Sequence, residues 1–414
     1  MSKTAVASGV LSADPPKLPV IGDTATRLTS VELFAGAGGL ALGCQMAGFE
    51  SLATVERDKW ACDTVRQNKH RGHELVANWN VHECDVRKFE WSKVTEDVTL
   101  VAGGPPCQPF STGGLAKASD DPRDMFPVTA EIISGLAPQA FIIENVRGLT
   151  RTAFSDYYEY IQHRLALPRL TSNPGEKWFD HLERLRAAIG DRQHHELNYR
   201  VVPTLVNAAD YGVPQQRHRV FIVGFRGDLD IEWSFPATSH SKHALLHSQW
   251  VTGDYWEEHE VPSSKRPEQP KQRIPEYLIT DEPQQRWRTV RDAFAGLPEP
   301  MVRPSRKVLN HEFQPGARSY PGHTGSPLDM PAKALKAGGH GVPGGENMLR
   351  NVDGSIRYFT VRESARLQTF PDDYELHGSW GEAMRQLGNA VPVLLGQVVA
   401  ESVYKALIRE GIKP

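Results

Sequence analysis

The chain has 414 residues, more than one hydrophobic core usually supports, so we expect one large and one smaller domain. Its net charge is −3, with 39% hydrophobic and 23% charged residues, which excludes a protein that is basic throughout and leaves room for a local basic face. Without a membrane-length apolar run or an N-terminal signal pattern, we expect a cytoplasmic protein with no membrane contact. The four cysteines contain no CxxC pair, so neither a disulfide framework nor a metal site is expected.

Strand and helix patterns alternate after a small, polar leader at residues 1–28, which we expect to be mobile. Apolar runs predict strands at residues 30–34, 51–55, 76–81, 98–102 and 140–143. Periodic patterns predict helices at residues 40–47 and 125–136, and a further helix that Asp58 caps and that runs through Asn68. This alternation predicts an α/β fold with a mostly parallel sheet covered on both faces.

The second half of the chain is less regular. Predicted strands at residues 199–206 and 219–224 flank a short, turn-rich connection and are therefore expected to form an antiparallel hairpin. A final helix over residues 391–407 has apolar side chains at spacings of three and four, and Asn389 and Pro392 suit its start. We expect the leader to be followed by a first domain at residues 29–234, a second region at 235–353 and a return to the first domain at 354–414.

A glycine-rich loop at residues 34–40 follows the first predicted strand and opens a helix. Its spacing differs from that of dinucleotide-binding and phosphate-binding loops. Glu56 ends the second strand, where a carboxylate can accept hydrogen bonds from a ribose diol, and Asp85 ends the third, where it can accept from an adenine amino group. A glycine loop with two such acids fits a nucleoside without a phosphate, and S-adenosylmethionine matches that description.

Cys107 follows a Gly-Gly-Pro-Pro run at residues 103–106. This run forces a rigid turn after a buried strand and presents the cysteine at the carboxyl edge of the sheet, where open α/β sheets bind ligands. Cys107 is therefore a candidate nucleophile, although most free cysteines are small buried hydrophobes. An unperturbed thiol has a pKa near ~8.5 and is mostly protonated at neutral pH, so Cys107 would need activation.

Two arginines are candidates for that activation, and a glutamate is a candidate for binding a base in the same pocket. Arg217 and Arg219 are two positions apart where the predicted strand at residues 219–224 begins. Because side chains alternate along a strand, both are expected to lie on one face, beside the pocket. Glu144 follows an apolar strand, and burying its carboxylate is costly unless the group is paired or functional. The alternatives are two surface arginines on an edge strand and a structural Glu144 paired with Arg147.

Together these residues resemble the DNA cytosine-5 methyltransferases of bacterial restriction–modification systems. The resemblance runs from about residue 30 to the C-terminus and keeps the family's order and spacing. It is carried by residues 34–40, Glu56, Asp85, 104–111 (GPPCQPFS), 144–146 (ENV), 215–219 (QQRHR), 362–368 (RESARLQ) and 388–392 (GNAVP). It implies a Rossmann-like, S-adenosylmethionine-dependent methyltransferase fold with a smaller, irregular target-recognition domain.

The resemblance also implies a mechanism in which a cytosine leaves the duplex of a specific DNA sequence and Cys107 bonds to its C6. Glu144 is expected to contact N3 and the 4-amino group, and Arg219 the O2, with Arg217 supporting the site. The implied cofactor contacts are Phe34, Gly36, Gly38, Gly39, Leu40, Glu56, Asp85, Pro106, Phe126, Asn389 and Val391. Residues 111–121 are expected to form a mobile loop that closes over DNA.

The target-recognition segment is expected at residues 235–353, where Lys333, Lys336 and glycines at 338–341 and 344–345 suit close approach to phosphates. Basic residues outnumber acidic ones ten to five between residues 303 and 366, although a solvated loop surface explains that bias equally well. No helix-turn-helix is visible, so the recognised sequence stays open. Residues 150–197 exceed a simple βα connection and are expected to face DNA or to be structural.

Rival functions remain. A tRNA cytosine-5 methyltransferase of the same fold would share the Pro-Pro-Cys-Gln signature, and a silent DNA-binding regulator would not need it. Adenine methylation normally uses an Asn/Asp-Pro-Pro-aromatic loop, which the sequence lacks after the fourth strand. The expected partners are double-stranded DNA and a restriction endonuclease that acts separately, and we expect a monomer, associated with the nucleoid when bound to DNA.

Overall fold

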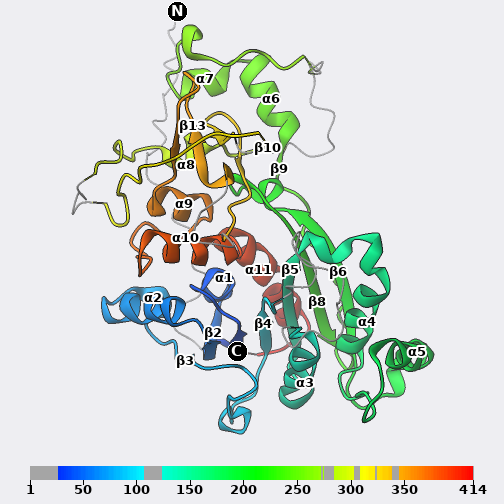
Figure 1. The fold of residues 1–414 in the computed structure, drawn as a ribbon. Helices are drawn as coiled ribbons and strands as arrows, with labels where there is room; N and C mark the ends of the chain where they lie inside the picture. Colours follow the sequence, from blue (N-terminus) through cyan, green and yellow to red (C-terminus); the bar gives the residue numbers. More distant parts are fainter. Residues whose placement is uncertain are drawn as a thin grey trace, which may run out of the picture.

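The computed structural model describes residues 27–106, 124–271, 274, 284–302, 308–321, 324–337 and 345–413. Its centre is a seven-stranded sheet in the order β3-β2-β1-β4-β5-β8-β6 (Figure 1). The strands are β1 (Leu28–Leu33), β2 (Phe49–Glu56), β3 (Val81–Glu83), β4 (Leu100–Gly103), β5 (Ala140–Val146), β6 (Tyr199–Asn207) and β8 (His218–Arg226). Only β8 runs against its neighbours in this sheet, which confirms a mostly parallel sheet with one antiparallel hairpin, β6–β8.

Helices cover both faces of this sheet because the central strands are apolar on both sides. In β5, Ala140 and Ile142 point into one core with α1 and α11, while Phe141 and Ile143 point into the other with α3 and α4. The helices are α1 (Gly39–Met46), α2 (Lys59–His70), α3 (Phe126–Leu136), α4 (Ser155–Ala166), α5 (Trp178–Ile189), α9 (Val361–Leu367), α10 (Trp380–Asn389) and α11 (Val393–Arg409).

The last helix returns to the first one at close range. A Cβ placed on Gly43 of α1 would lie 2.5 Å from the backbone nitrogen of Gln397 in α11, so a larger residue there would push the helices apart. Val399, Val403 and Leu407 complete the same core beneath α1. Residues more than 350 positions apart in the chain therefore build one wall of the molecule.

The described residues between 240 and 358 form a second lobe, above the sheet in Figure 1, from short elements. Its elements are β9 (His240–Ser241), α6 (Lys242–Trp250), α7 (Asp254–Glu258), β10 (Gln285–Arg286), α8 (Val290–Phe294), β11 (Ser326–Pro327), β12 (Ala332–Lys333), β13 (Met348–Arg350) and β14 (Ile356–Tyr358). β12 pairs with β7 (Gln215–Gln216), which directly precedes the Arg217–Arg219 segment. Two small apolar clusters pack the lobe against its neighbours, one reaching Leu367 of α9 and the other Ala209, and the β12–β7 pair joins the lobe to the segment just before β8.

Two expectations about local structure were wrong, and two helices were missed. The strand predicted at residues 76–81 begins only at Val81, as β3, because Val76 lies in a short 3-10 helix instead. Asn389 ends α10 rather than starting the final helix, whose N-cap is Pro392. The amphipathic helices α4 and α5 within residues 150–197 were not predicted.

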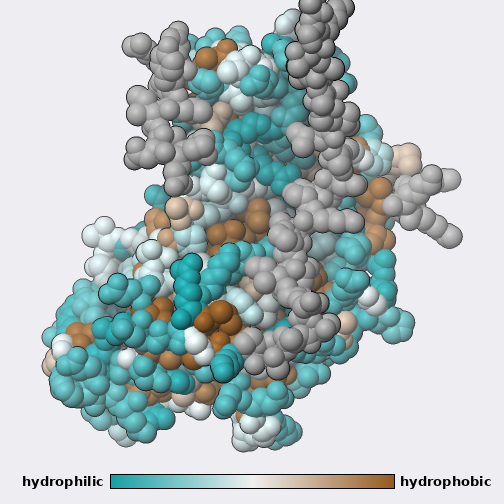
Figure 2. Space-filling view, turned by 180° about the vertical axis from the view of Figure 1, so that it is seen from behind, coloured by the Kyte–Doolittle hydropathy of each residue, from teal (hydrophilic) through white to brown (hydrophobic). Residues whose placement is uncertain are grey.

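The sequence reading found no apolar run long enough to span a membrane, but one helical stretch meets that criterion by length and composition. The α10–α11 stretch, Trp380–Arg409, passes that test. In the structure, however, α11 packs its apolar side against α1 and the sheet, as the core helix of a globular protein does. On the face turned away in Figure 1, hydrophilic residues cover most of the described surface (Figure 2).

Candidate active site

A cavity of about 640 Å³ opens at the carboxyl ends of β1, β2, β4 and β5. This is the edge at which open α/β sheets bind ligands. Among its lining residues are Glu144, Arg219, Phe34, Gly36, Gly39, Leu40, Glu56, Asp85, Pro106, Asn389 and Val391. Of the other predicted site residues, Gly38, Phe126 and Arg217 lie outside the lining, and Cys107 lies outside the described residues, as does the expected loop at 111–121.

The glycine loop packs its backbone against the chain that follows α10. Gly38 caps α1 with a φ of 96°, which a side chain would strain. A Cβ on Gly39 would lie 2.2 Å from the carbonyl oxygen of Val391, so only glycine allows this approach. Gly38 thus shapes the loop from outside the cavity, and the Gly39–Val391 contact brings two predicted cofactor segments together.

Glu56 joins the end of β2 to the glycine loop. One carboxylate oxygen accepts a hydrogen bond from the Gly36 backbone N–H at 2.8 Å, and the other accepts from the N–H groups of Arg57 and Asp58 at 2.7 Å each. Asp58 in turn caps α2 by accepting from the Ala61 N–H, as predicted. A carboxylate has about four acceptor positions, so Glu56 keeps capacity for a ligand hydroxyl.

Asp85 is held by its neighbour Arg87. The carboxylate accepts from the Arg87 backbone N–H and Nε at 2.9 Å each and from Nη2 at 2.5 Å. These hydrogen bonds lower the pKa of Asp85 to about 2, so the group is ionised at neutral pH. A ligand amino group that binds Asp85 would share the carboxylate with the exposed Arg87.

Glu144 and Arg219 form a buried ion pair on the cavity wall. Arg219 Nε lies 2.7 Å from Glu144 Oε1, and the two side chains are only 12% and 9% exposed. The pair forms because β5 and β8 are antiparallel neighbours, with Val146 opposite Arg219. Burial raises the pKa of Glu144, and the positive charge of Arg219 opposes that rise. Glu144 therefore holds a proton to higher pH than an ordinary glutamate does.

The turn that leads to Cys107 is tied to the same strand end. The Asn145 side-chain amide donates to the carbonyl oxygen of Pro105 at 3.0 Å. A Cβ on Gly104 would lie 3.1 Å from Glu144 Oε2, so glycine leaves room beside the carboxylate. The chain up to Pro106 is thus part of the wall that contains Glu144.

Arg217 does not have the placement predicted for it beside the pocket. Its guanidinium is fully buried and donates to three carbonyl oxygens, of Leu335 at 2.8 Å, Gly388 at 2.7 Å and Ala390 at 2.9 Å. It therefore fastens the second lobe and the Asn389 segment to the start of β8. We assign Arg217 a positioning role, which sequence alternation cannot distinguish from a pocket role.

We expect Arg217→Lys to lower the free energy of unfolding by about 2–4 kcal/mol, because an ammonium cannot reach three carbonyls in the fixed geometry of a guanidinium. It should also raise the KM for S-adenosylmethionine, since Gly388 and Ala390 flank Asn389 on the cavity. Arg366→Lys is the matched control, because Arg366 also donates to two backbone carbonyls, of Ala293 at 3.1 Å and Ala295 at 2.7 Å, and none of the three residues lines the cavity. Denaturant titration and steady-state kinetics measure both effects, and equal KM values for the two variants would contradict this role.

Some lining residues were missed by sequence reasoning. Met125 lines the cavity in place of Phe126, whose ring points into the core as the first residue of α3. The match to Phe126 depended on spacing across residues 107–123, and its role in cofactor binding stays a prediction. Arg385 of α10 also lines the cavity, where its Nη2 donates to Asp58 at 3.0 Å. No local signal connects two residues that far apart in the chain.

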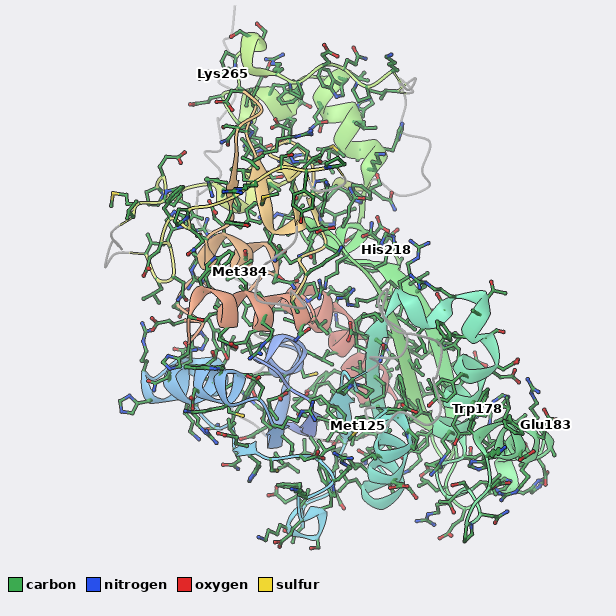
Figure 3. The ribbon with its side chains drawn as sticks, in the orientation of Figure 1. Met125, Trp178, Glu183, His218, Lys265 and Met384 are labelled. Atoms are coloured by element: carbon green, nitrogen blue, oxygen red, sulfur yellow. The ribbon has the colours of Figure 1, made fainter. Side chains whose placement is uncertain are left out.

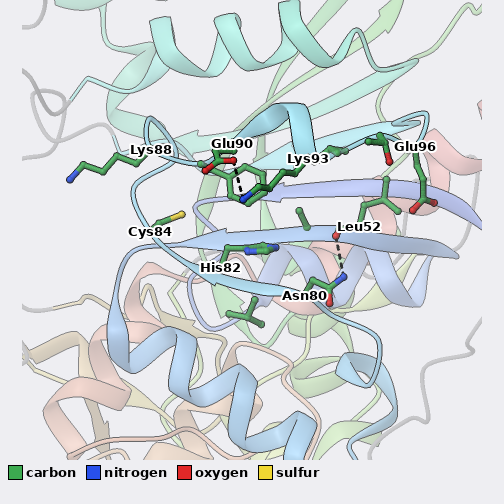
Figure 4. Close-up of a pocket in the computed structure, with 13 residues that line it drawn as sticks. Leu52, Asn80, His82, Cys84, Lys88, Glu90, Lys93 and Glu96 are labelled. Atoms are coloured by element: carbon green, nitrogen blue, oxygen red, sulfur yellow. Dashed lines mark hydrogen bonds and ion pairs between the residues drawn. The ribbon is translucent and has the colours of Figure 1, made fainter.

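A second cavity, of about 600 Å³, lies beside β3 (Figure 4). Leu52, Phe89 and Val94 contribute apolar wall, and Lys93 and Glu90 pair at 3.0 Å on its rim. Cys84 lines both cavities, but none of the predicted site residues lines this one. The predicted chemistry therefore belongs to the cavity that contains Glu144.

Glu258, His259 and Asp292 are the described residues close enough together to hold a metal ion. Arg286 already donates to both carboxylates, to Glu258 at 3.0 Å and to Asp292 at 2.8 Å. A cationic side chain thus occupies the position that a metal would need, and we assign no metal site to this group.

Comparisons with known proteins agree with this arrangement. The family model of the C-5 cytosine-specific DNA methylases matches residues 28–166 and 191–405. The Type II methyltransferase M.PspPI of Psychrobacter sp. (strain TA137) is 31% identical over 387 residues, covering 91% of this chain and 79% of that protein. The Type II methyltransferase M.Eco47II of Escherichia coli is 32% identical over 389 residues, covering 92% and 79%.

Solved structures share the fold at lower identity. The Dnmt2 methyltransferase of S. pombe superposes with a TM-score of 0.52 at 16% identity, covering 94% of this chain and all of that one. A prophage-encoded E. coli protein described as a DNA modification methyltransferase has a TM-score of 0.57 at 21% identity, covering 92% and 99%. With the family model matched over most of its length, the chain belongs to the C-5 cytosine-specific DNA methylases, which transfer a methyl group from S-adenosylmethionine to cytosine in DNA.

Proposed function

We propose that this enzyme methylates C5 of a cytosine that has left the duplex within a specific double-stranded DNA sequence, and that Cys107 bonds transiently to C6 of that base. One observation carries the proposal: the buried Glu144–Arg219 pair lines the same cavity as the glycine loop, Glu56 and Asp85. A base-binding pair and a nucleoside-binding wall in one cavity fit a group transfer between two nucleosides.

The residues present fit S-adenosylmethionine. The cavity volume of about 640 Å³ lies within the range of small-molecule sites. Glu56 would accept from the ribose hydroxyls and Asp85 from the adenine amino group, while the glycine loop lets the chain approach closely. The two carboxylates also make the cavity more favourable for a cationic ligand than for a phosphate. When bound, S-adenosylmethionine supplies an activated methyl group on a sulfonium.

The protein residues would prepare the cytosine for that methyl group. The Cys107 thiolate adds to C6, and the displaced electron pair moves toward C5 and N3 of the ring. Glu144, whose raised pKa favours the protonated form, donates to N3, and Arg219 binds O2. C5 would then take the methyl group, whose bond to the sulfonium breaks so that the sulfur leaves as a neutral thioether. Loss of the C5 proton to a base and expulsion of the thiolate restore the aromatic ring and the free enzyme.

The extent of the second lobe favours a duplex DNA target over a tRNA, and its lysines could contact the phosphates of either. Lys336 is exposed, apart from a pairing with Glu346 at 2.7 Å, and Lys333 contacts Thr324 at 3.1 Å. Lysines at such positions suit phosphate contacts, whereas the glycines at 338–341 and 344 lie outside the described residues. We further propose that the protein acts as a monomer in the cytoplasm and, like the Type II methyltransferases it resembles, beside a separate restriction endonuclease.

Sequencing of 5-methylcytosine in DNA from cells that express this chain and lack other cytosine methylation tests the proposal. We expect methylation at one short sequence motif at every occurrence. Parallel reactions with purified enzyme, labelled S-adenosylmethionine and either duplex DNA or tRNA distinguish the two substrates. Label in tRNA alone would reject the DNA target, and no label in either would favour the silent regulator.

A further inference from the structure

Helix α5 lies in the one internal stretch, residues 167–190, that the family model does not match. The stretch begins where α4 ends and stops shortly before β6. It is therefore an addition to the family's core, and its contacts indicate what the addition does in this protein.

The added helix packs firmly on α4. Its Trp178 ring lies edge-on to Tyr157 and Tyr160 of α4, at centroid distances of 5.2 and 5.9 Å. His181 of α5 is fully buried and bridges the two elements: its Nε2 donates to the carbonyl of Leu170 at 2.9 Å. Burial lowers the pKa of His181, so the neutral ring accepts from the Tyr160 hydroxyl through Nδ1, at 3.2 Å. The aromatic face of α4 is thus held in place by α5.

From α4 the contact continues to the start of α3. The hydroxyl of Tyr157, itself only 3% exposed, donates to one carboxylate oxygen of Asp124. The other carboxylate oxygen of Asp124 accepts from the Phe126 backbone N–H at 3.1 Å. Asp124 therefore links the tyrosine to the first turn of α3, and both of its oxygens are used.

Met125, which stands between Asp124 and Phe126 in the chain, is part of the cavity wall. Met125 lines the cavity together with Asp85 and Pro106. Figure 3 shows Met125 near the cavity end of α3 and Trp178 on α5 at the outer side of the molecule. A continuous series of contacts, Trp178 to Tyr157 to Asp124, thus connects the added helix with the cavity wall.

We propose that α5 is a positioning element for the cofactor: through Trp178, Tyr157 and Asp124 it holds Met125 and the first turn of α3 against bound S-adenosylmethionine. The proposal rests on the binding of S-adenosylmethionine in this cavity, as proposed above. Tyr157 and Asp124 are positioning residues here, since the contact with the ligand is made by Met125.

The test is Tyr157→Phe, which removes one hydroxyl and keeps the ring against Trp178. We expect the Kd for S-adenosylmethionine, measured by calorimetry without DNA, to rise about 3- to 10-fold, because only part of the effect of the lost hydrogen bond reaches the ligand through Met125. The KM for S-adenosylmethionine should rise in parallel, while the KM for DNA stays within about twofold. Trp178→Ala should give a similar rise, and the double variant should show less than the product of the two effects because both act through Tyr157.

Two further variants separate positioning from general stability. Tyr158→Phe makes the same change one residue along α4, at a hydroxyl with no hydrogen bond to a described residue, and should leave the Kd unchanged. Asp124→Ala removes the acceptor of the same hydrogen bond and should raise the Kd at least as much as Tyr157→Phe does. Thermal denaturation of each variant measures the loss of stability separately.

An unchanged Kd in Tyr157→Phe overturns the inference, as does a lowered Tm with no change in Kd, which would make the hydroxyl purely structural. Failure of the proposed function gives a different pattern, because the wild-type protein itself would then bind no S-adenosylmethionine or methylate no DNA. The wild-type calorimetry and DNA labelling are therefore run with every variant.

Discussion

Replacing Cys107 with serine is expected to lower the rate of DNA methylation by on the order of 10³-fold or more, because a hydroxyl is a far weaker nucleophile than a thiolate. Binding of S-adenosylmethionine should stay within about twofold of wild type, since the described cavity wall forms without the sulfur atom. Single-turnover transfer of labelled methyl groups to duplex DNA measures the first effect and calorimetry the second.

Trapping of the enzyme on DNA tests the same covalent mechanism by a chemical route. Fluorine at C5 of the target cytosine prevents loss of a proton from that carbon, so the bond between Cys107 and C6 should persist. We expect a denaturation-resistant complex with wild-type protein and none with Cys107→Ser. Full activity of Cys107→Ser, or a trapped complex whose crosslinked peptide lacks residue 107, would refute the covalent mechanism.

Glu144→Gln is expected to reduce kcat by about 10²–10⁴-fold, the usual contribution of a positioned proton donor. The physical reason is the buried pair: Glu144 lies 2.7 Å from Arg219, and burial raises the pKa of its carboxyl. The amide keeps the size of the side chain but cannot transfer a proton to the ring, and it leaves Arg219 buried without its counter-charge.

The pH dependence has a defined sign. A raised pKa means that Glu144 stays protonated to higher pH than an ordinary glutamate, so kcat should fall as pH rises through that pKa. In Glu144→Gln this falling limb should disappear, because the amide does not titrate. A kcat–pH profile with the same falling limb in both proteins would assign the limb to another group.

The control for this variant is Glu363→Gln. Glu363 is likewise a buried glutamate paired with an arginine, Arg357, at 2.6 Å, but neither residue lines the cavity. The change should lower stability, since Glu363 also caps α9, yet kcat per folded molecule should stay near wild type. A loss equal to that of Glu144→Gln would mean that buried charge alone, and not its place in the cavity, governs activity.

Local patterns predicted much of this protein correctly. Apolar runs located β1, β2, β4 and β5, and the residue that follows such a run in a parallel sheet necessarily reaches the carboxyl edge. For that reason Glu56, Asp85 and Glu144, which are far apart in sequence, could be expected in one site, and all three line the cavity. Their roles in binding and catalysis stay predictions.

Other features depend on contacts between distant segments. Alternation put Arg217 and Arg219 on one face, but only Arg219 meets Glu144, because carbonyls from the second lobe and the α10 end surround Arg217. Helix α3 begins at Phe126, whose ring packs in the core, whereas the preceding residue, Met125, lines the cavity. Spacing across residues 107–123 cannot resolve this difference of one residue.

The sequence by itself determined the α/β class, the glycine loop and the charged residues at the strand ends, because strand ends, glycine turns and motif order are local properties. The tertiary structure alone decided which charges pair, how α11 packs under α1 and how α5 reaches the cavity through Tyr157 and Asp124. Those outcomes depend on burial and on hydrogen bonds between residues tens to hundreds of positions apart. Such contacts form, and contribute to stability, only when the chain is folded.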